Sequence, residues 1–261
     1  MAYNSLYDKS QYYDIVFERD VSQEINFVRQ VFAHHMGRPL ESVLELACGP
    51  GYHTVAFAEA GLRAIGLDLQ SEMLNVARDK AGSRGVEASW LEADMTDFSL
   101  EEPVDAVVSM FDGITVLPTL DLLIANFQAV ARNLKPGGLY ILDHMHPRDQ
   151  SPADYGTLYW SGERDGVFVE LIWPVNRPEI DLQTSTITVE VELRVTKNGA
   201  QEVYRDTATE RVFILPQEFE MLARLSGVFR PLAYYGNFLL DQPLDFSARS
   251  TQMIIVLQKT S

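Results

Sequence analysis

Glycines and acidic residues follow the apolar runs of the N-terminal half at points where they could bind a ligand. The run VLELA (43–47) contains Glu45 and continues into a loop that carries Gly49 and Gly51. Glycine lets the backbone approach a ligand closely and adopt torsion angles that are closed to other residues. The helix expected after the loop offers free amide groups to a polar or anionic part of that ligand. Such a loop can also simply turn the chain, so residues further along the sequence must distinguish a ligand-binding loop from a turn.

Two later carboxylates make the pattern more specific. Asp68 ends the run LRAIGLD (62–68), 17 residues after Gly51, where a carboxylate can accept both hydroxyl hydrogens of a ribose. Asp94 ends the next run and precedes Met95, which places an acceptor and an apolar side chain where a purine could be held. A dinucleotide fingerprint would have glycine where this chain has Thr54. That departure opposes a nicotinamide-dependent oxidoreductase, the alternative among enzymes.

His144 and His146 directly follow the fifth expected strand. Ligands of open α/β sheets bind outside the carboxyl ends of the strands, so both are candidate general bases. In an extended chain their spacing would put both side chains on one side. Two other interpretations stay open: a pair of metal ligands beside Asp143, for which no third ligand is identified, and structural histidines bonded to the backbone. We predict no metal site.

These residues require strands and helices that alternate along the chain. Such alternation predicts βαβ units and a parallel sheet covered by helices on both faces, which is an α/β fold. The expected strands are 42–47, 62–68, 86–94, 104–110 and 137–143, and the expected helices are 52–60, 71–80 and 120–134.

The N-terminal segment lacks such regularity. Residues 1–20 are aromatic and polar without a regular core-facing spacing, and we expect an arm or lid. Ser22 is expected to cap a helix that runs to about His35 and stops at Gly37.

The period changes after the fifth strand. Residues 184–197 alternate strictly between apolar and polar, and Asn198-Gly199 predicts a hairpin turn into a strand over 201–214. A further hairpin is expected from 157–161 and 166–173, so 151–214 form an antiparallel β insertion. After it, Pro216 opens a helix, and two extended stretches at 229–238 and 250–259 should close the main sheet as an antiparallel pair.

The motifs ELACGPG, GLDLQSEML, EADMTDF and LKPGGLYILD occur in this order. In this respect the chain resembles the class I S-adenosylmethionine-dependent methyltransferases, over about 41–143 and again over 216–259. The resemblance implies a seven-stranded Rossmann-like sheet with an antiparallel C-terminal strand. It predicts a core of residues 1–150 and 215–261, with an N-terminal arm and helix at 1–40, and an insertion at 151–214.

The resemblance also implies cofactor-binding residues. In the loop that carries Gly51, the backbone of Ala47 and Gly49 would meet the methionine portion of S-adenosylmethionine, and Glu45 would orient its ammonium group. The other implied contacts are Asp68 with the ribose, Leu69 on the adenine, Asp94 and Met95 at the adenine amino group, and Met110 and Phe111 beneath the sulfonium.

The arm and the insertion would complete the site. The sequence YYD (12–14) resembles an arm in which a tyrosine closes over the cofactor, and we favour Tyr13, with a purely packing role as the alternative. The insertion is expected either to cover the acceptor pocket or to form a homodimer interface. Similar methyltransferases with a β insertion act on amines or hydroxyls of small molecules, so we expect transfer to nitrogen or oxygen of a small-molecule acceptor. The insertion residues that could line the acceptor pocket are Tyr155, Tyr159, Trp160 and Trp173.

Composition limits the partners and the compartment. The net charge of -16 should repel phosphate backbones, so no nucleic-acid partner is expected. Cys48 is the single cysteine, and no apolar run reaches the roughly 18 residues that span a membrane, so we expect a cytoplasmic protein without a membrane partner. A catalytically silent, S-adenosylmethionine-binding regulatory protein is the alternative outside enzymes.

Overall fold

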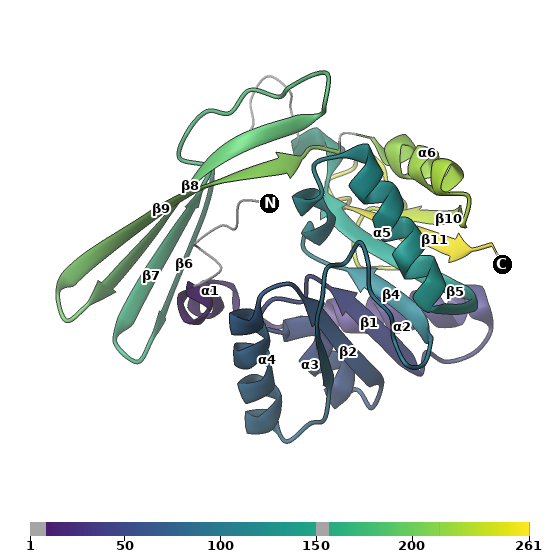
Figure 1. Ribbon diagram of the computed structural model, residues 1–261, viewed down its shortest axis with the longest axis horizontal. Coiled ribbons are helices and arrows are strands. Elements are labelled where there is room, and N and C mark those ends of the chain that lie inside the picture. The colour runs from purple at the N-terminus through teal and green to yellow at the C-terminus, as the bar shows by residue number, and fades with distance from the viewer. Residues whose placement is uncertain (1–8, 150–156, 214, 261) are drawn as a thin grey trace.

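The main sheet of the molecule confirms the predicted α/β class. The computed structural model describes residues 9–149, 157–213 and 215–260. Seven strands lie in the order β10-β11-β5-β4-β1-β2-β3, with β11 antiparallel to its neighbours β5 and β10 (Figure 1). Their bounds are Ser42–Leu46 for β1, Arg63–Asp68 for β2, Ser89–Glu92 for β3, Val104–Ser109 for β4, Leu134–Met145 for β5, Phe229–Tyr235 for β10 and Gln252–Lys259 for β11.

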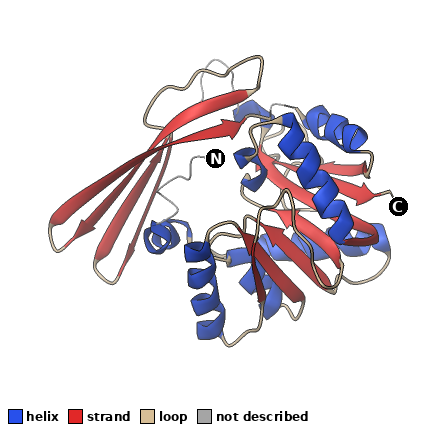
Figure 2. Ribbon diagram, in the orientation of Figure 1, coloured by secondary structure: helices blue, strands red, loops and turns tan. Residues whose placement is uncertain are grey.

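Helices cover both faces of this sheet (Figure 2). Successive residues of β4 point to opposite faces, so Val107 packs in the core with Phe127, while Val108 packs with Val28 in the other core. No helix among the described residues is long and apolar enough to cross a membrane. The helices are α2 (Ser22–Met36), α3 (Tyr52–Glu59), α4 (Ser71–Arg84), α5 (Leu120–Asn133) and α6 (Pro216–Ser226), with short 3₁₀ helices η2 (Gly113–Val116) and η3 (Pro147–Asp149).

The start of α2 differs in detail from the prediction. Ser22 is the first helical residue, and Val21 occupies the cap position. The carboxylate of Asp20 accepts the Ser22 amide at 2.9 Å, so an acidic side chain two residues earlier satisfies this free donor. Gly37 ends the helix in the left-handed conformation, at φ 66°, as predicted.

The insertion forms a separate four-stranded antiparallel sheet in the order β6-β7-β8-β9 (Figure 1). The hairpin turns fall where the sequence predicted them. Asn198 and Gly199 both have positive φ, 52° and 76°, as a turn matched to strand twist requires. The strands are β6 (Leu158–Arg164), β7 (Val167–Trp173), β8 (Thr186–Lys197) and β9 (Ala200–Arg211).

A helix that the sequence did not predict, α1 (Ser10–Phe17), lies between the two sheets. It packs so closely on β6 that a side chain at Gly162 would collide with the Ile15 carbonyl. The Asp14 carboxylate is buried and lies 2.7 Å from Lys80 of α4 and 2.7 Å from Arg164 of β6. The arm is therefore a junction between the main sheet and the insertion.

Candidate active site

The glycine loop after β1 is shaped by two left-handed glycines. At Gly51 (φ 76°) a Cβ atom would lie 2.7 Å from the Trp90 ring and 2.8 Å from Ala77 Cβ, so no side chain fits there. At Gly49 (φ 51°) a Cβ would meet nothing within 4 Å. Ala47 also has a positive φ, 50°, which is unusual for a residue with a side chain. The loop thus presents bare backbone to open space at the carboxyl end of β1.

Glu45 lies beneath this loop and is 4% exposed. Its carboxylate accepts the Thr54 amide at 2.8 Å and the Thr54 hydroxyl, and it lies 2.9 Å from His53 Nδ1. These bonds fix the first turn of α3 against the end of β1. The residue that replaces the third glycine of the dinucleotide fingerprint, Thr54, therefore has a structural partner in Glu45.

Asp68 joins the loop to the end of β2. One carboxylate oxygen accepts the Gly49 amide at 2.8 Å, and the other accepts the Gln70 amide at 2.9 Å. Burial raises the pKa of Asp68, and the charge of Glu45 adds to the rise. Each carboxylate oxygen has further acceptor capacity, and Leu69 beside it leaves 39% of its surface exposed. An acceptor and an apolar face therefore lie side by side.

The predicted adenine pair, Asp94 and Met95, follows β3. One oxygen of Asp94 accepts both the Thr96 amide and the Thr96 hydroxyl, at 2.8 and 2.7 Å, which fixes the orientation of the carboxylate. Met95 is buried in the core, and its carbonyl accepts a bond from Asn126 at 2.9 Å. This pair lies on the same carboxyl edge of the sheet as Asp68, because β2 and β3 are parallel neighbours.

At the end of β4 the structure separates Met110 from Phe111. Met110 is buried in the core against α2, whereas Phe111 is 43% exposed. Phe111 and Asp112 both adopt positive φ, 52° and 59°, and the Phe111 amide donates to Asp143 at 3.1 Å. Backbone strain of this kind is maintained by its surroundings and is concentrated at functional sites. The strained turn places Phe111 outside the core.

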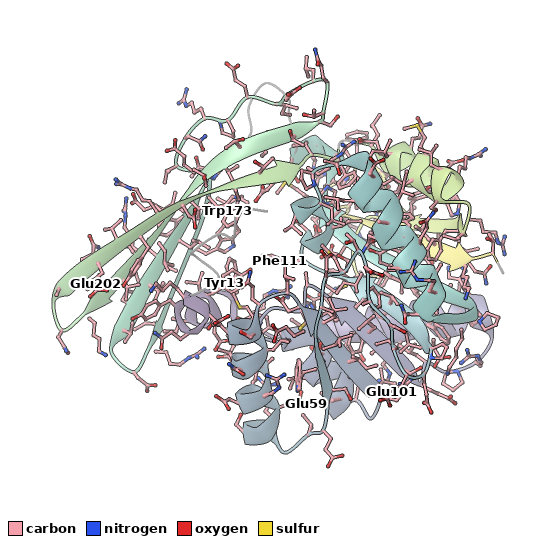
Figure 3. The ribbon with its side chains drawn as sticks, viewed as in Figure 1. Tyr13, Glu59, Glu101, Phe111, Trp173 and Glu202 are labelled. Atoms are coloured by element: carbon pink, nitrogen blue, oxygen red, sulfur yellow. The ribbon has the colours of Figure 1, made fainter. Side chains whose placement is uncertain are left out.

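Tyr13 stands between the two sheets. Figure 3 shows Tyr13, Phe111 and Trp173, from α1, from the end of β4 and from β7, around the space between the sheets. Burial raises the pKa of the Tyr13 hydroxyl, and the charges of Asp68 and Glu210 raise it further. The hydroxyl thus lies within electrostatic reach of a residue from each sheet.

The two candidate bases lie in different environments. His144 is 2% exposed, contacts the rings of Phe213 and Phe219, and places Nδ1 against the Asp112 carboxylate. His146 is 1% exposed, its Nε2 bonds the Asp245 carbonyl at 2.8 Å, and its Nδ1 accepts the Arg148 amide at 3.1 Å. Both nitrogens of His146 have main-chain partners, which is the structural arrangement that the sequence left open.

Three polar residues near this space were not predicted from the sequence. Arg19 lies over the Phe111 ring at 5.8 Å, Asp112 follows Phe111, and Glu210 comes from β9. Asp112 could have been inferred from its place after a strand end. No motif marks Arg19 or Glu210, because their positions depend on how the arm and the insertion dock.

Of the insertion aromatics, Trp160 and Trp173 lie on the face that meets α1. Strand pairing sets Trp160 opposite Leu171, and the ring of Trp160 lies 5.2 Å from Phe17. Tyr159 points to the other face, is 54% exposed, and donates its hydroxyl to Glu170. Tyr155 lies outside the described residues.

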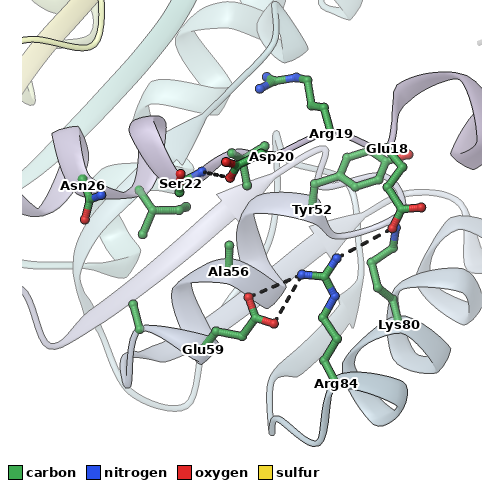
Figure 4. Close-up of a pocket in the computed structure, with 13 residues that line it drawn as sticks. Glu18, Arg19, Asp20, Ser22, Asn26, Tyr52, Ala56, Glu59, Lys80 and Arg84 are labelled. Atoms are coloured by element: carbon green, nitrogen blue, oxygen red, sulfur yellow. Dashed lines mark hydrogen bonds and ion pairs between the residues drawn. The ribbon is translucent and has the colours of Figure 1, made fainter.

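A separate cavity of about 530 Å³ lies between the α1–α2 connection and helices α3 and α4 (Figure 4). Its charged side chains pair with one another, for example Arg84 with Glu59 at 3.3 Å and with Glu18 at 3.7 Å. The cavity follows α3 from Tyr52, the residue after Gly51, as far as Ala60. Its ion pairs attach the arm to the core.

The residues at the carboxyl edge fit an adenosyl sulfonium. A bare glycine loop, a carboxylate with acceptor capacity and two exposed apolar side chains match a methionine portion, a ribose and a purine. The two exposed side chains, Leu69 and Phe111, follow β2 and β4, the strands on either side of β1. With β11 antiparallel to both of its neighbours, the sheet has the topology predicted for a methyltransferase.

Comparisons with known proteins agree. Residues 43–138 match the family described as "Methyltransferase domain". The putative methyltransferase YqeM of Bacillus subtilis is 36% identical over 219 residues, 84% of each chain. Cypemycin N-terminal methyltransferase of a Streptomyces species is 27% identical over 265 residues, 99% of this chain and 100% of that one. A crystal structure of an S-adenosylmethionine-dependent methyltransferase from Clostridium acetobutylicum has a TM-score of 0.76 and 19% identity, covering 97% of this chain and 98% of that chain.

The chain belongs to the class I S-adenosylmethionine-dependent methyltransferases. The predicted resemblance, activity and cofactor are thereby confirmed. Neither the nicotinamide-dependent oxidoreductase nor the silent regulatory protein gains support from the comparisons.

Proposed function

We propose that this methyltransferase transfers its methyl group to an amine nitrogen of a small acceptor that binds between the two sheets. The observation that carries the proposal is the combination of carboxylates and aromatic rings around that space. Asp112 and Phe111 come from the core, Glu210 and Trp173 from the insertion, and Tyr13 from the arm. Carboxylates and aromatic faces both attract cations, and a basic amine is a cation in neutral water. The Streptomyces relative is named an N-terminal methyltransferase, and an N-terminus carries an amine.

The predicted cofactor contacts remain part of this proposal. S-adenosylmethionine supplies a methyl carbon that is activated by a positively charged sulfur. Asp68 would accept the ribose hydroxyls and Leu69 would cover the adenine, while Asp94 would accept the adenine amino group. In the proposed complex the face of Phe111 lies beneath the sulfonium, where an aromatic ring contributes about 1 kcal/mol of cation–π attraction. Glu45 acts through the loop, because its carboxylate is occupied by His53 and Thr54.

The insertion would act as a cover for the acceptor. Its face with Trp160 and Trp173 is turned to α1, and β9 packs against η2 at the end of the core sheet. Alignment of the acceptor nitrogen, the methyl carbon and the sulfur is the main requirement of the reaction. Such positioning can lower the barrier by roughly 7 to 11 kcal/mol in favourable cases. A cover that excludes water and orients the acceptor would supply it.

The test uses pairs of small compounds that differ only in carrying an amino or a hydroxyl group, such as cyclohexylamine with cyclohexanol and glucosamine with glucose. Each compound is incubated with the protein and isotope-labelled S-adenosylmethionine, and mass spectrometry detects the labelled methyl group. A metabolite extract serves as a broader source of acceptors. We expect methylated amines. Methylation of alcohols without amines would reject the nitrogen acceptor while leaving the transferase in place.

A further inference from the structure

Strand pairing places Glu210 on the inner face of the insertion. Glu210 of β9 stands opposite Ile187 of β8, whose side chain is buried on the face that also carries Val189 and Leu193. On β6, the same face carries Gly162, which touches α1. Because side chains alternate along a strand, Glu210 points to the side of the arm and the core. The same face of β9 also carries Asp206 and Glu202, opposite Val191 and Val195 of β8.

Trp173, Asp112, Tyr13 and Ile187 are among the described residues near Glu210. The indole N–H of Trp173 lies close enough to the Glu210 carboxylate to lower its pKa. The charge of Asp112 acts on it from the core, because β9 packs against η2, and η2 begins directly after Asp112. Tyr13 of α1 lies within its electrostatic reach, and Ile187 stands beside it on β8. Glu210 therefore lies within electrostatic reach of Asp112, near the place where β9 meets η2.

The carboxylate of Asp112 is held in place from the core side. One of its oxygens accepts the Met145 amide at 2.9 Å and also contacts His144 Nδ1. The side chain remains 35% exposed, whereas that of His144 is 2% exposed. His144 is thus a positioning residue that acts through Asp112, and Asp112 is the member of the pair that can meet an acceptor.

An amine acceptor creates a chemical requirement at this point. A protonated amine has no free electron pair, so it must lose one proton before its nitrogen can attack the methyl carbon. The base that accepts this proton must lie within hydrogen-bond reach of the nitrogen. A second negative charge nearby would hold the cation in place while the proton leaves.

We infer that Glu210 of the insertion accepts the proton of the bound ammonium group, while Asp112 of the core anchors that group by its charge. This inference rests on the proposed amine acceptor. In the step, an N–H bond of the ammonium breaks and its proton bonds to a Glu210 oxygen. The freed electron pair forms the new N–C bond as the C–S bond breaks, and the electrons of that bond stay on sulfur. The methylated nitrogen then carries the positive charge.

Burial supports this assignment. It raises the pKa of Glu210 to about 7, the charge of Asp112 adds to the rise, and the Trp173 bond opposes it. A base whose pKa lies near the working pH is the most effective proton acceptor. Burial also raises the pKa of Asp143 to about 7, with the Asp112 charge as the next cause, but Asp143 is 4% exposed and bonded to the Phe111 amide. Of these two carboxyl groups, Glu210 is the one on the face that the insertion turns to the arm.

The first test replaces the proton acceptor with a group of the same shape. Glu210→Gln keeps an acceptor oxygen near Trp173 but takes up no proton. With the best amine of the acceptor panel, we expect kcat at pH 7 to fall by about 10²- to 10⁴-fold. The loss should shrink by about tenfold per pH unit as the pH approaches the pKa of the amine, because more amine then arrives neutral. A merely structural role would lower the rate equally at every pH.

Glu190→Gln is the matched control, because Glu190 is an exposed residue on the outer face of the neighbouring strand β8. We expect it to retain the wild-type rate and pH profile. Amine turnover that survives Glu210→Gln at pH 7 would overturn this inference alone. Turnover of alcohols only would overturn the proposed function and this inference together.

A second measurement needs no acceptor. The carboxyl carbon of Glu210 is titrated by carbon-13 NMR and identified by its absence from Glu210→Gln. Tetramethylammonium, used as the cation probe, should lower the pKa of Glu210, because a cation favours the carboxylate. Asp112→Asn should lower it too, because it removes a like charge. An unchanged pKa in both experiments would overturn the inference even if the panel gives no turnover.

Discussion

The two sheets of the molecule differ in how they bury their strands. Every residue of β1 and β4 in the main sheet is buried, as expected for parallel strands covered by helices on both faces. In the insertion, β8 alternates along most of its length, and Ile187, Val189 and Val191 are buried while Thr188 and Glu190 are exposed. The main sheet is buried on both faces, whereas the insertion sheet exposes one face to water and turns the other to the arm.

In the proposed reaction, the main sheet binds the cofactor and the insertion acts on the acceptor. The main sheet gathers the proposed cofactor residues at strand ends, where the fold dictates their positions. The insertion contributes Glu210 and Trp173 from the face of a sheet, where position depends on docking. Helix α1 connects the two, because Asp14 pairs with Lys80 of the core and with Arg164 of the insertion. The comparison predicts that core variants disturb cofactor binding and insertion variants disturb acceptor chemistry.

The largest effect is expected from a glycine in the core. Gly51→Ala combines a left-handed backbone (φ 76°) with a Cβ atom 2.7 Å from Trp90. The backbone term costs about 1 to 2 kcal/mol and overpacking about 1 to 3 kcal/mol, so the free energy of unfolding should fall by roughly 2 to 5 kcal/mol. Chemical denaturation measures this change, and calorimetry should show weaker cofactor binding.

Gly166→Ala in the insertion is the control for that experiment. Gly166 has nearly the same φ, 74°, but a Cβ atom there would meet nothing within 4 Å. Only the backbone cost of about 1 to 2 kcal/mol should appear, with cofactor affinity unchanged. Equal losses in the two variants would contradict the role assigned to crowding at Gly51.

The next largest effect on stability is expected at α1, the junction between the main sheet and the insertion. Asp14→Ala removes the buried partner of Lys80 and Arg164, and the free energy of unfolding should fall by about 1.5 to 3 kcal/mol. Burial would raise the pKa of Asp14, but the bonds from Lys80 and Arg164 outweigh it and hold that pKa below 3.8. The wild-type advantage should therefore persist at neutral pH and disappear as the pH falls through the lowered pKa. Denaturation at several pH values measures it.

Glu163→Ala is the control, because Glu163 is an exposed residue beside Arg164 in β6. It should change the free energy of unfolding by less than about 0.5 kcal/mol. If Asp14→Ala behaves like this control, α1 does not join the sheets in the way described.

Sequence patterns predicted the strands and turns of both sheets because these features follow from local rules. The loop at Gly49 and Gly51 and the reversed β11 were both expected. The turn at Asn198-Gly199 was also predicted, since its torsion angles depend on those two residues alone. These features are encoded within a few neighbouring positions.

The arm could not be predicted in the same way. Phe17 becomes core only where it meets Phe111 and Trp160, which lie 94 and 143 residues after it in the sequence. The apolar residues of the arm therefore showed no regular spacing in the sequence. The position of Glu210 depends on the same docking. His146 looked like a base by its place after β5, yet the Asp245 carbonyl takes up its Nε2, and that contact comes from a distant loop.

A smaller effect separates cofactor binding from acceptor chemistry. Asp68→Ala should weaken S-adenosylmethionine binding by more than tenfold, about 1.4 kcal/mol, because the variant loses the proposed ribose bonds. Glu210→Gln should leave that affinity unchanged. Calorimetric titration of both variants gives the comparison directly. If the two lose cofactor affinity to the same extent, the division of labour between the sheets is wrong.

The smallest effect concerns stability and pH. The pKa of Glu210 in the folded chain, about 7, lies above its usual value of 4.5, so folding takes up a proton between these values. The free energy of unfolding therefore falls as the pH rises from 4.5 toward 7. Glu210→Gln removes this penalty and should make the protein more stable than wild type at pH 8, with no gain at pH 4. Thermal unfolding at the two pH values measures the difference. A gain of equal size at both would mean that Glu210 is not a buried carboxylate held ready to take a proton, and the insertion would then be only a cover.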